Sequence, residues 1–251
     1  MANACIAYTN RADVSGVLIT ATSANLLLPA SNVVNPHIAR KWRGTTTGSD
    51  SIIIDMGAPI TFDTMAVFGL VADQVIAKAS LVDATGAAGE IYSDTVAVDQ
   101  AYLDTIHLTT PRSARYFRFE LTKSASFVEA GRVFIGSRTQ FAYNFVKGWS
   151  RVWIDTSLRS RTRGGQTQVW PDNVYRSYDV SFDFLTKADR DGFVEDIDRV
   201  NAMKTDILFI TDPASTNLAR DSVWGLVTSI SPVVQQFINS YTKQYQIDER
   251  L

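Results

Sequence analysis

The chain has 251 residues, and its 24 Lys and Arg against 26 Asp and Glu give a formal net charge of −2. A duplex-DNA-binding domain is usually basic, so this balance argues against specific nucleic-acid binding, and a single cysteine, Cys5, excludes an intrachain disulfide. No apolar run approaches the roughly 18 residues of a membrane-spanning helix, so we expect no membrane insertion.

The first half of the chain has the pattern of short strands separated by turns. We expect strands at 51–57, 65–71, 77–86, 114–121 and 131–136. The clearest is ARYFRFEL (114–121), in which apolar and polar residues alternate as in a half-buried strand. No long amphipathic pattern precedes residue 137. We therefore predict an antiparallel β-sandwich over residues 1–137 with Ile52, Ile54, Phe117 and Phe119 in its core.

The second half combines strands with one helix. Strands are expected at 151–158, 178–185, 206–213, 222–230 and 237–248. A helix is predicted over about 187–204, because Thr186 and Asp189 have the spacing of a capping box. Its apolar stripe would contain Phe193, Ile197, Val200 and Met203. The fold class is thus mainly β, with residues 138–251 forming a β-rich domain that carries one α-helix.

The stretch RSRTRGGQTQVW (159–170) has three arginines at alternate positions, followed by two glycines. If Gly164 and Gly165 form a two-residue hairpin turn, Arg159 lies opposite Trp170 as a cation–π pair. Arg161 and Arg163 then share the face of Arg159, so an anionic partner is expected. A solvated surface hairpin is the alternative. A nucleic-acid grip would need interleaved aromatic residues, and this stretch has only Trp170.

Charge is distributed unevenly within the second domain. Residues 138–176 contain seven basic and two acidic side chains, whereas residues 177–251 contain seven basic and twelve acidic ones. The first segment therefore has a formal net charge of +5 and the second a formal net charge of −5. Head-to-tail self-association can use such complementarity, and head-to-tail contacts close into rings. The acidic partners are expected on the helix, at Glu195, Asp196 and Asp198.

Candidate catalytic groups are sparse. Neither His37 nor His107 has Cys, Asp or Glu at metal-ligand spacing, and nucleophile-elbow, phosphate-loop and dinucleotide motifs are absent. Asp50 and Asp55 are weaker candidates for a metal ion. We predict no enzyme activity, catalytic residue, metal site or cofactor. Trp42 either packs in the core or stacks on a sugar ring.

The first half resembles the discoidin family of β-sandwiches, also known as F5/8 type C, a fold shared by many carbohydrate-binding modules. The resemblance rests on the order of five segments: LPASNVVNP (28–36), KWRG (41–44), IIIDMG (52–57), ARYFRFEL (114–121) and GRVFIG (131–136). It implies a sandwich fold and, as an alternative function, attachment to host surface glycans.

The second half resembles distal-tail and baseplate proteins from the tail tip of long-tailed bacteriophages. The matching segments are RTRGGQTQVW (161–170), VSFDFLTKADRDGF (180–193), DILFITDP (206–213) and SVWGLVTSI (222–230). This resemblance implies a structural virion protein, made in the host cytoplasm and assembled as a ring at the tail tip. Its partners would be other copies of itself and other tail proteins, connecting the tail tube to tip or fibre proteins.

Overall fold

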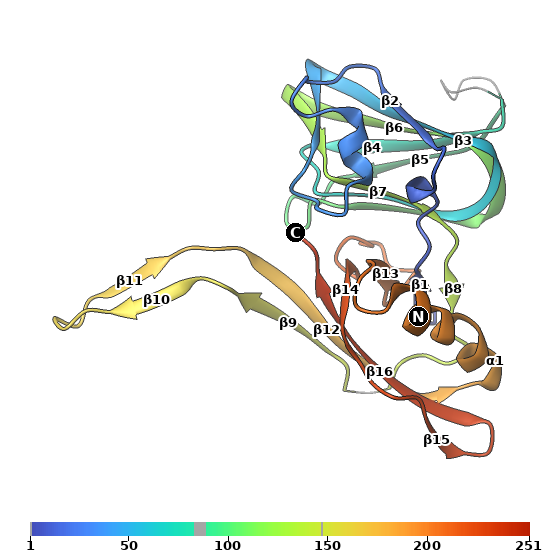
Figure 1. Ribbon diagram of the computed structural model, residues 1–251. Helices are drawn as coiled ribbons and strands as arrows, with labels where there is room; N and C mark the ends of the chain where they lie inside the picture. The colour runs from blue at the N-terminus through green and yellow to red at the C-terminus, as the bar shows by residue number, and fades with distance from the viewer. Residues whose placement is uncertain (1, 83–88, 147) are drawn as a thin grey trace. The chain divides into compact units, whose positions relative to one another are not determined.

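The computed structural model describes residues 2–82, 89–146 and 148–251 (Figure 1). Its contacts divide the chain into two compact units. Unit 1 contains Met1–Gln140, Leu208–Ser222 and Leu251, and unit 2 contains Phe141–Ile207 and Val223–Arg250. The predicted division into residues 1–137 and 138–251 differs from these units, because the segment Leu208–Ser222 belongs to unit 1.

Both units are mainly β, as predicted. The strands of the first 140 residues are β1 (Cys5–Ala7), β2 (Leu18–Ala21), β3 (Trp42–Phe68), β4 (Gln74–Ser80), β5 (Glu90–Ala97), β6 (Thr105–Ala130), β7 (Arg132–Gly136) and β8 (Thr139–Gln140). The later strands are β9 (Ser150–Asp155), β10 (Leu158–Arg161), β11 (Thr167–Trp170), β12 (Val174–Leu185), β13 (Ile207–Ile210), β14 (Ser222–Ile230), β15 (Val234–Phe237) and β16 (Ser240–Glu249). The helical segments are η1 (Arg11–Asp13), η2 (Ala30–Val34), α1 (Lys187–Asp189), η3 (Arg190–Val194) and η4 (Ile197–Asn201).

Unit 1 contains a sheet in the order β2-β3-β6-β4-β5, with β7 also paired to β3. The long strands β3 and β6 pair along most of their length, with register shifts that let the sheet curve. The predicted strand 51–57 and residues 65–68 of the predicted strand 65–71 are both parts of β3, which ends at Phe68. Gly57, at φ +74°, bends the chain at the register shift after Asp55 without ending the strand. Of the predicted strand 77–86, residues 83–86 lie outside the described residues.

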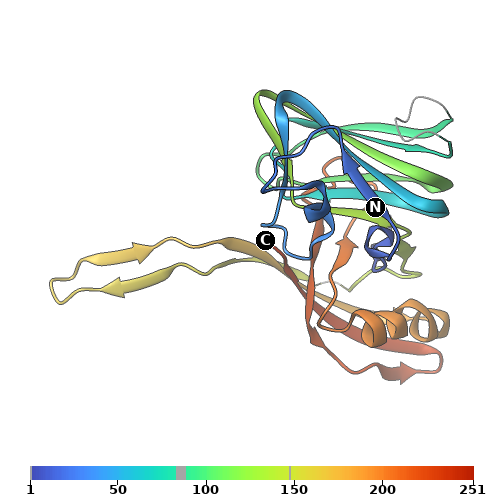
Figure 2. The ribbon, with the colours of Figure 1, turned by 45° about the horizontal axis from the view of Figure 1, so that its top comes forward.

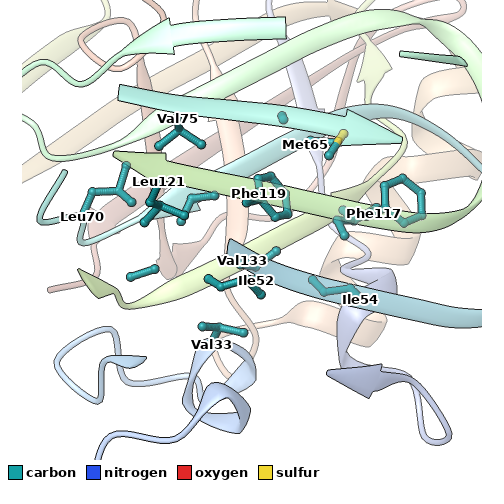
Figure 3. Packing of buried hydrophobic residues seen from close by; sticks show 14 of the residues in the cluster. Val33, Ile52, Ile54, Met65, Leu70, Val75, Phe117, Phe119, Leu121 and Val133 are labelled. Carbon is teal, nitrogen blue, oxygen red and sulfur yellow. The ribbon is translucent and has the colours of Figure 1, made fainter. Parts of the chain in front are cut away.

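The core of unit 1 lies between the layers of the curved sheet (Figure 3). Ile52 and Ile54 from β3 and Phe117 and Phe119 from β6 are fully buried, which confirms this part of the prediction. The ring of Phe62 meets that of Phe117 edge to face, with centroids 4.9 Å apart. Alternation along β6 therefore separates a buried apolar face from a face that carries polar side chains.

Three further strands of unit 1 lie outside the long sheet, and one of them, β13, comes from a distant part of the sequence. β1 pairs with β8 and with β13, so that Ile6 lies opposite both Thr139 and Phe209. The segment that follows β13, up to Ser222, also belongs to unit 1. In it the Asn217 amide donates to the Asp99 carboxylate at 2.8 Å. That hydrogen bond is the main factor lowering the pKa of Asp99. The local sequence pattern does not indicate that residues 208–222 belong to unit 1.

Unit 2 contains four strands in the order β14-β16-β12-β9, with β15 added to β16. Tyr178, Val180 and Phe182 of β12 are buried on one face of the sheet. Phe141 stacks on Phe182 with ring centroids 3.9 Å apart and meets Phe193 of the helical segment edge to face. This face is thus covered from within the unit.

The helical segment begins with the capping box that the sequence predicts. The Thr186 hydroxyl accepts from the Asp189 amide at 3.1 Å, and the Asp189 carboxylate accepts from the Thr186 amide at 3.1 Å. The segment ends at Asn201 and not at 204, because Ala202 adopts a positive φ of +46°.

The predicted apolar stripe of this helix is correct only in its first half. Phe193 and Ile197 are buried, but Val200 and Met203 are more than half exposed. Most of the segment is π-helical, and the Ala202 amide bonds to the Ile197 carbonyl five residues earlier. The wider turn places Asn201, which is 1% exposed, where an α-helix would place Val200.

Candidate functional site

A long β-hairpin extends from the sheet of unit 2 (Figures 1 and 2). We call residues 150–175 the arm. Its base is β9 paired with the start of β12, and its distal part is β10 paired with β11. Every residue of β10 and β11 is exposed. A two-stranded ribbon with both faces in water is marginally stable by itself, so the arm has the character of a segment that binds a partner.

Large apolar side chains are exposed along the arm. They are Val152, Trp153, Leu158, Val169, Trp170 and Val174, with exposed fractions of 46–70%. Tryptophan is enriched at protein interfaces because it buries much apolar surface while its N–H keeps a polar partner. Of these residues only Trp170 is a candidate from the sequence, because the alternation of 151–158 resembles that of a strand with a covered face. Exposure on both faces is visible only in the structure.

The register of the hairpin differs by one residue from the prediction. Leu158 lies opposite Trp170, and Arg159 lies opposite Val169. The turn is a three-residue loop, in which the Gly165 amide bonds to the Thr162 carbonyl at 2.9 Å and Gly165 has φ +82°. The proposed Arg159–Trp170 pair is therefore wrong. Arg159 instead pairs with the Asp155 carboxylate at 2.9 Å.

Arg161 and Arg163 lie near the tip of the arm. Arg161 has its Nε 3.4 Å from the Gly165 carbonyl, and Arg163 lies in the turn. Within the described parts of the chain, neither forms an ion pair with a carboxylate. Two guanidinium groups without a carboxylate partner among the described residues thus lie near the tip of the arm.

The predicted acidic partners on the helix do not form one free face. Asp198 pairs with the buried Lys243 ammonium at 2.6 Å, and Asp196 pairs with Arg199 at 3.0 Å. Of the three predicted carboxylates, Glu195 is exposed, whereas Asp196 and Asp198 are half-buried. Most of the negative charge on this helix is therefore compensated within unit 2.

Trp42 is fully buried in unit 1, so its ring offers no face to a sugar. Its indole N–H donates to the Ser23 carbonyl at 3.0 Å. Of the two alternatives for Trp42, the structure therefore shows core packing. The interpretation of Trp42 as a glycan-binding residue is wrong.

The weak metal candidates both have other partners. Two hydroxyls, from Thr22 and Ser23, donate to the buried Asp50 carboxylate at 2.9 and 2.7 Å. Asp55 is held by Arg115 through both carboxylate oxygens, and these bonds lower the pKa of Asp55. The described residues contain no group of three or more His, Cys, Asp or Glu that could hold a metal ion.

The two histidines and the cysteine, which are the other candidate groups for chemistry, belong to unit 1. His37 is exposed, and His107 is buried with Nδ1 2.9 Å from the Asp94 carboxylate, a pair that the sequence did not indicate. The bond from His107 lowers the pKa of Asp94.

Burial raises the pKa of the Cys5 thiol to about 12, which leaves it unreactive as a nucleophile. Among the described helical segments, none has the length and apolarity needed to cross a membrane.

No family model matches this chain, and no curated protein matches it. Its fold is similar to a fucose-binding module of Streptococcus pneumoniae, at 10% identity over 51% of this chain and 95% of that one, with a TM-score of 0.43. A family 32 carbohydrate-binding module of C. perfringens, solved with galactose, gives 13% identity over 53% and 99%, with a TM-score of 0.42. The chain covers 27% of a fucosidase of Ruminococcus gnavus, at 15% identity and a TM-score of 0.45. At these values the similarity assigns neither a ligand nor an activity to this chain.

We expect any glycan affinity of the protein to be weak and independent of metal ions. The reason is that Trp42 is buried and that Asp50 and Asp55 are occupied by other side chains. The measurement is a glycan-array screen of the full chain with calcium and with a chelator. Tight, calcium-dependent binding would contradict this expectation.

Proposed function

We propose that this protein is a non-enzymatic structural subunit that assembles head to tail into a ring, with the arm of each copy bound to the next copy. The observation that carries the proposal is the arm itself, an exposed ribbon with six large exposed apolar side chains and two arginines that form no ion pair with a described carboxylate. Binding to another chain would remove this apolar surface from water.

A second copy is the partner that the charges favour. The basic surplus of residues 138–176 matches the acidic surplus of residues 177–251 within the same chain. A contact between two different surfaces of identical subunits is heterologous, and such contacts close into a ring when the rotation permits. Charge complementarity would then set the register of the contact.

We further propose that the ring belongs to the tip of a bacteriophage tail, where it would connect the tail tube to tip or fibre proteins. The support is the resemblance of residues 161–230 to distal-tail and baseplate proteins. Gold-labelled antibodies against the chain, applied to purified phage particles, test this placement. Labelling at the tail tip is expected, and labelling confined to another part of the particle would contradict it.

Trimming the arm tests the assembly. Residues 156–173 are replaced by Asn-Gly, which joins Asp155 to Val174 across their existing pair and leaves β9 paired with β12. We expect the full chain, whose monomer mass is 27.7 kDa, to form oligomers, and the trimmed chain to have the lower mass of its own monomer in light scattering after size exclusion. The far-ultraviolet circular dichroism of the trimmed chain should remain that of a folded β protein.

Two results would contradict the proposal: a full chain that is monomeric at high concentration, or a trimmed chain that still forms the same oligomer. A matched control replaces the exposed apolar turn Leu26-Leu27 of unit 1 by Ser-Ser, since these side chains are 94% and 85% exposed. That variant should assemble normally, because the contact depends on the arm and not on exposed apolar surface in general.

A further inference from the structure

The sheet of unit 2 has one covered and one open face. The side chains on the open face are Asp179, Ser181 and Asp183 of β12 and Gln244, Gln246 and Asp248 of β16. They alternate with the buried residues of the same strands, such as Val180 and Tyr245. The six polar side chains named above are exposed or half-buried, whereas Ser177, opposite Asp248 at the end of this face, is buried.

Three carboxylates lie on this open face without a cation. Asp179 accepts from the Gln244 amide at 2.8 Å, Asp248 from the Ser177 hydroxyl at 2.6 Å and Asp183 from the Ser181 hydroxyl at 3.3 Å. All of these donors are neutral. Among the described residues, none of the three carboxylates forms an ion pair, in contrast to Asp198 and Asp196 on the helix.

Beside Asp183 this face has a hollow of about 280 Å³, bounded by β12, β15, β16 and the segment before β15. Ser181, Thr242 and Gln244 contribute uncharged polar residues to its lining. Lys243 also lines it, but the Lys243 ammonium is bound to Asp198 at 2.6 Å. A guanidinium that entered the hollow would find the Asp183 carboxylate and several uncharged acceptors, which suits its five N–H donors.

We propose that the open face of the unit 2 sheet is the surface that receives the arm of the neighbouring copy, with Arg161 and Arg163 bound to Asp179 and Asp183. This proposal rests on the assembly proposed above and names its second surface. The argument is charge complementarity: the unpaired cations of the chain's arm and the unpaired carboxylates of its sheet would compensate one another. It replaces the helix as the receiving surface, because the helix carboxylates Asp196 and Asp198 already have cations.

A charge exchange tests this contact. Arg161→Glu with Arg163→Glu should abolish the oligomer, and so should Asp179→Lys with Asp183→Lys, because each places like charges in contact. The chain carrying all four changes should regain the oligomer, since opposite charges again meet. Masses are measured by light scattering after size exclusion, and folding of each variant is checked by thermal denaturation followed by circular dichroism.

The controls are two charge reversals at exposed positions of unit 1, Arg40→Glu and Glu90→Lys, which belong to neither the arm nor the sheet of unit 2. Both should leave the oligomer unchanged. If trimming the arm gives monomers but the fourfold variant remains monomeric and folded, the receiving surface lies elsewhere and this inference fails while the assembly proposal stands. If the trimmed chain assembles normally, the assembly proposal itself fails.

Discussion

Replacing Phe119 by Asp is expected to unfold unit 1. The side chain is fully buried among the apolar residues of the core, where a carboxylate would have neither water nor a cation. Loss of a buried phenylalanine alone costs about 3–5 kcal/mol. Burial of a charge adds to this, and the total approaches the whole stability of a domain, about 5–15 kcal/mol.

The measurement is thermal denaturation of the full chain followed by circular dichroism. Thr122→Asp is the matched control, because Thr122 is exposed on the same strand β6, three residues along. We expect the control to melt within a few degrees of the parent, while Phe119→Asp loses the transition of unit 1. A Phe119→Asp variant that melts like the parent would show that this strand face is not the core.

Glu249→Ala is expected to cause a large loss in the free energy of unfolding of unit 2. Arg176 is 1% exposed, and its Nε donates to the Glu249 carboxylate at 2.8 Å. The second carboxylate oxygen accepts from the Arg176 backbone amide, also at 2.8 Å. Removing one partner of such a pair leaves a buried charge uncompensated, which costs about 3–5 kcal/mol.

The control is Asp196→Ala, which removes the exposed ion pair with Arg199 on the helix. A pair of that kind contributes about 0–1 kcal/mol, so the control should change stability little. Urea denaturation gives the free energy of unfolding for both variants. Equal losses in the two variants would mean that the Arg176–Glu249 pair is exposed to solvent and not buried as described here.

Several elements follow from local sequence because their causes are local. In 114–121 the period of two alone separates Phe117 and Phe119 from Arg118 and Glu120, and the structure buries the first pair. The spacing of Thr186 and Asp189 fixes the start of the helix, since both hydrogen bonds of the cap join residues three apart. The two glycines at 164–165 likewise predict that a hairpin turns there, and it does.

Details of these elements depend on small energy differences. Two- and three-residue hairpin loops both suit a Gly-Gly pair. In the structure the Thr162 hydroxyl accepts from the Gln166 amide at 3.2 Å, which fits the three-residue loop and shifts every cross-strand neighbour of the arm by one residue. The same sensitivity applies to the helical segment, where the π-helical turn buries Asn201 and leaves Val200 exposed.

By itself the sequence determined the mainly β fold, the core face of β6, the helix cap and an arginine-rich hairpin, because each depends on residues a few positions apart. Only the tertiary structure decided which charges remain without partners. Lys243 neutralises Asp198 from 45 positions away, whereas Asp179 and Asp183 meet only neutral donors. Strand pairing determines which of these side chains meet. β1 pairs with β13 and β12 pairs with β16, and no local sequence pattern indicates that these distant segments lie side by side.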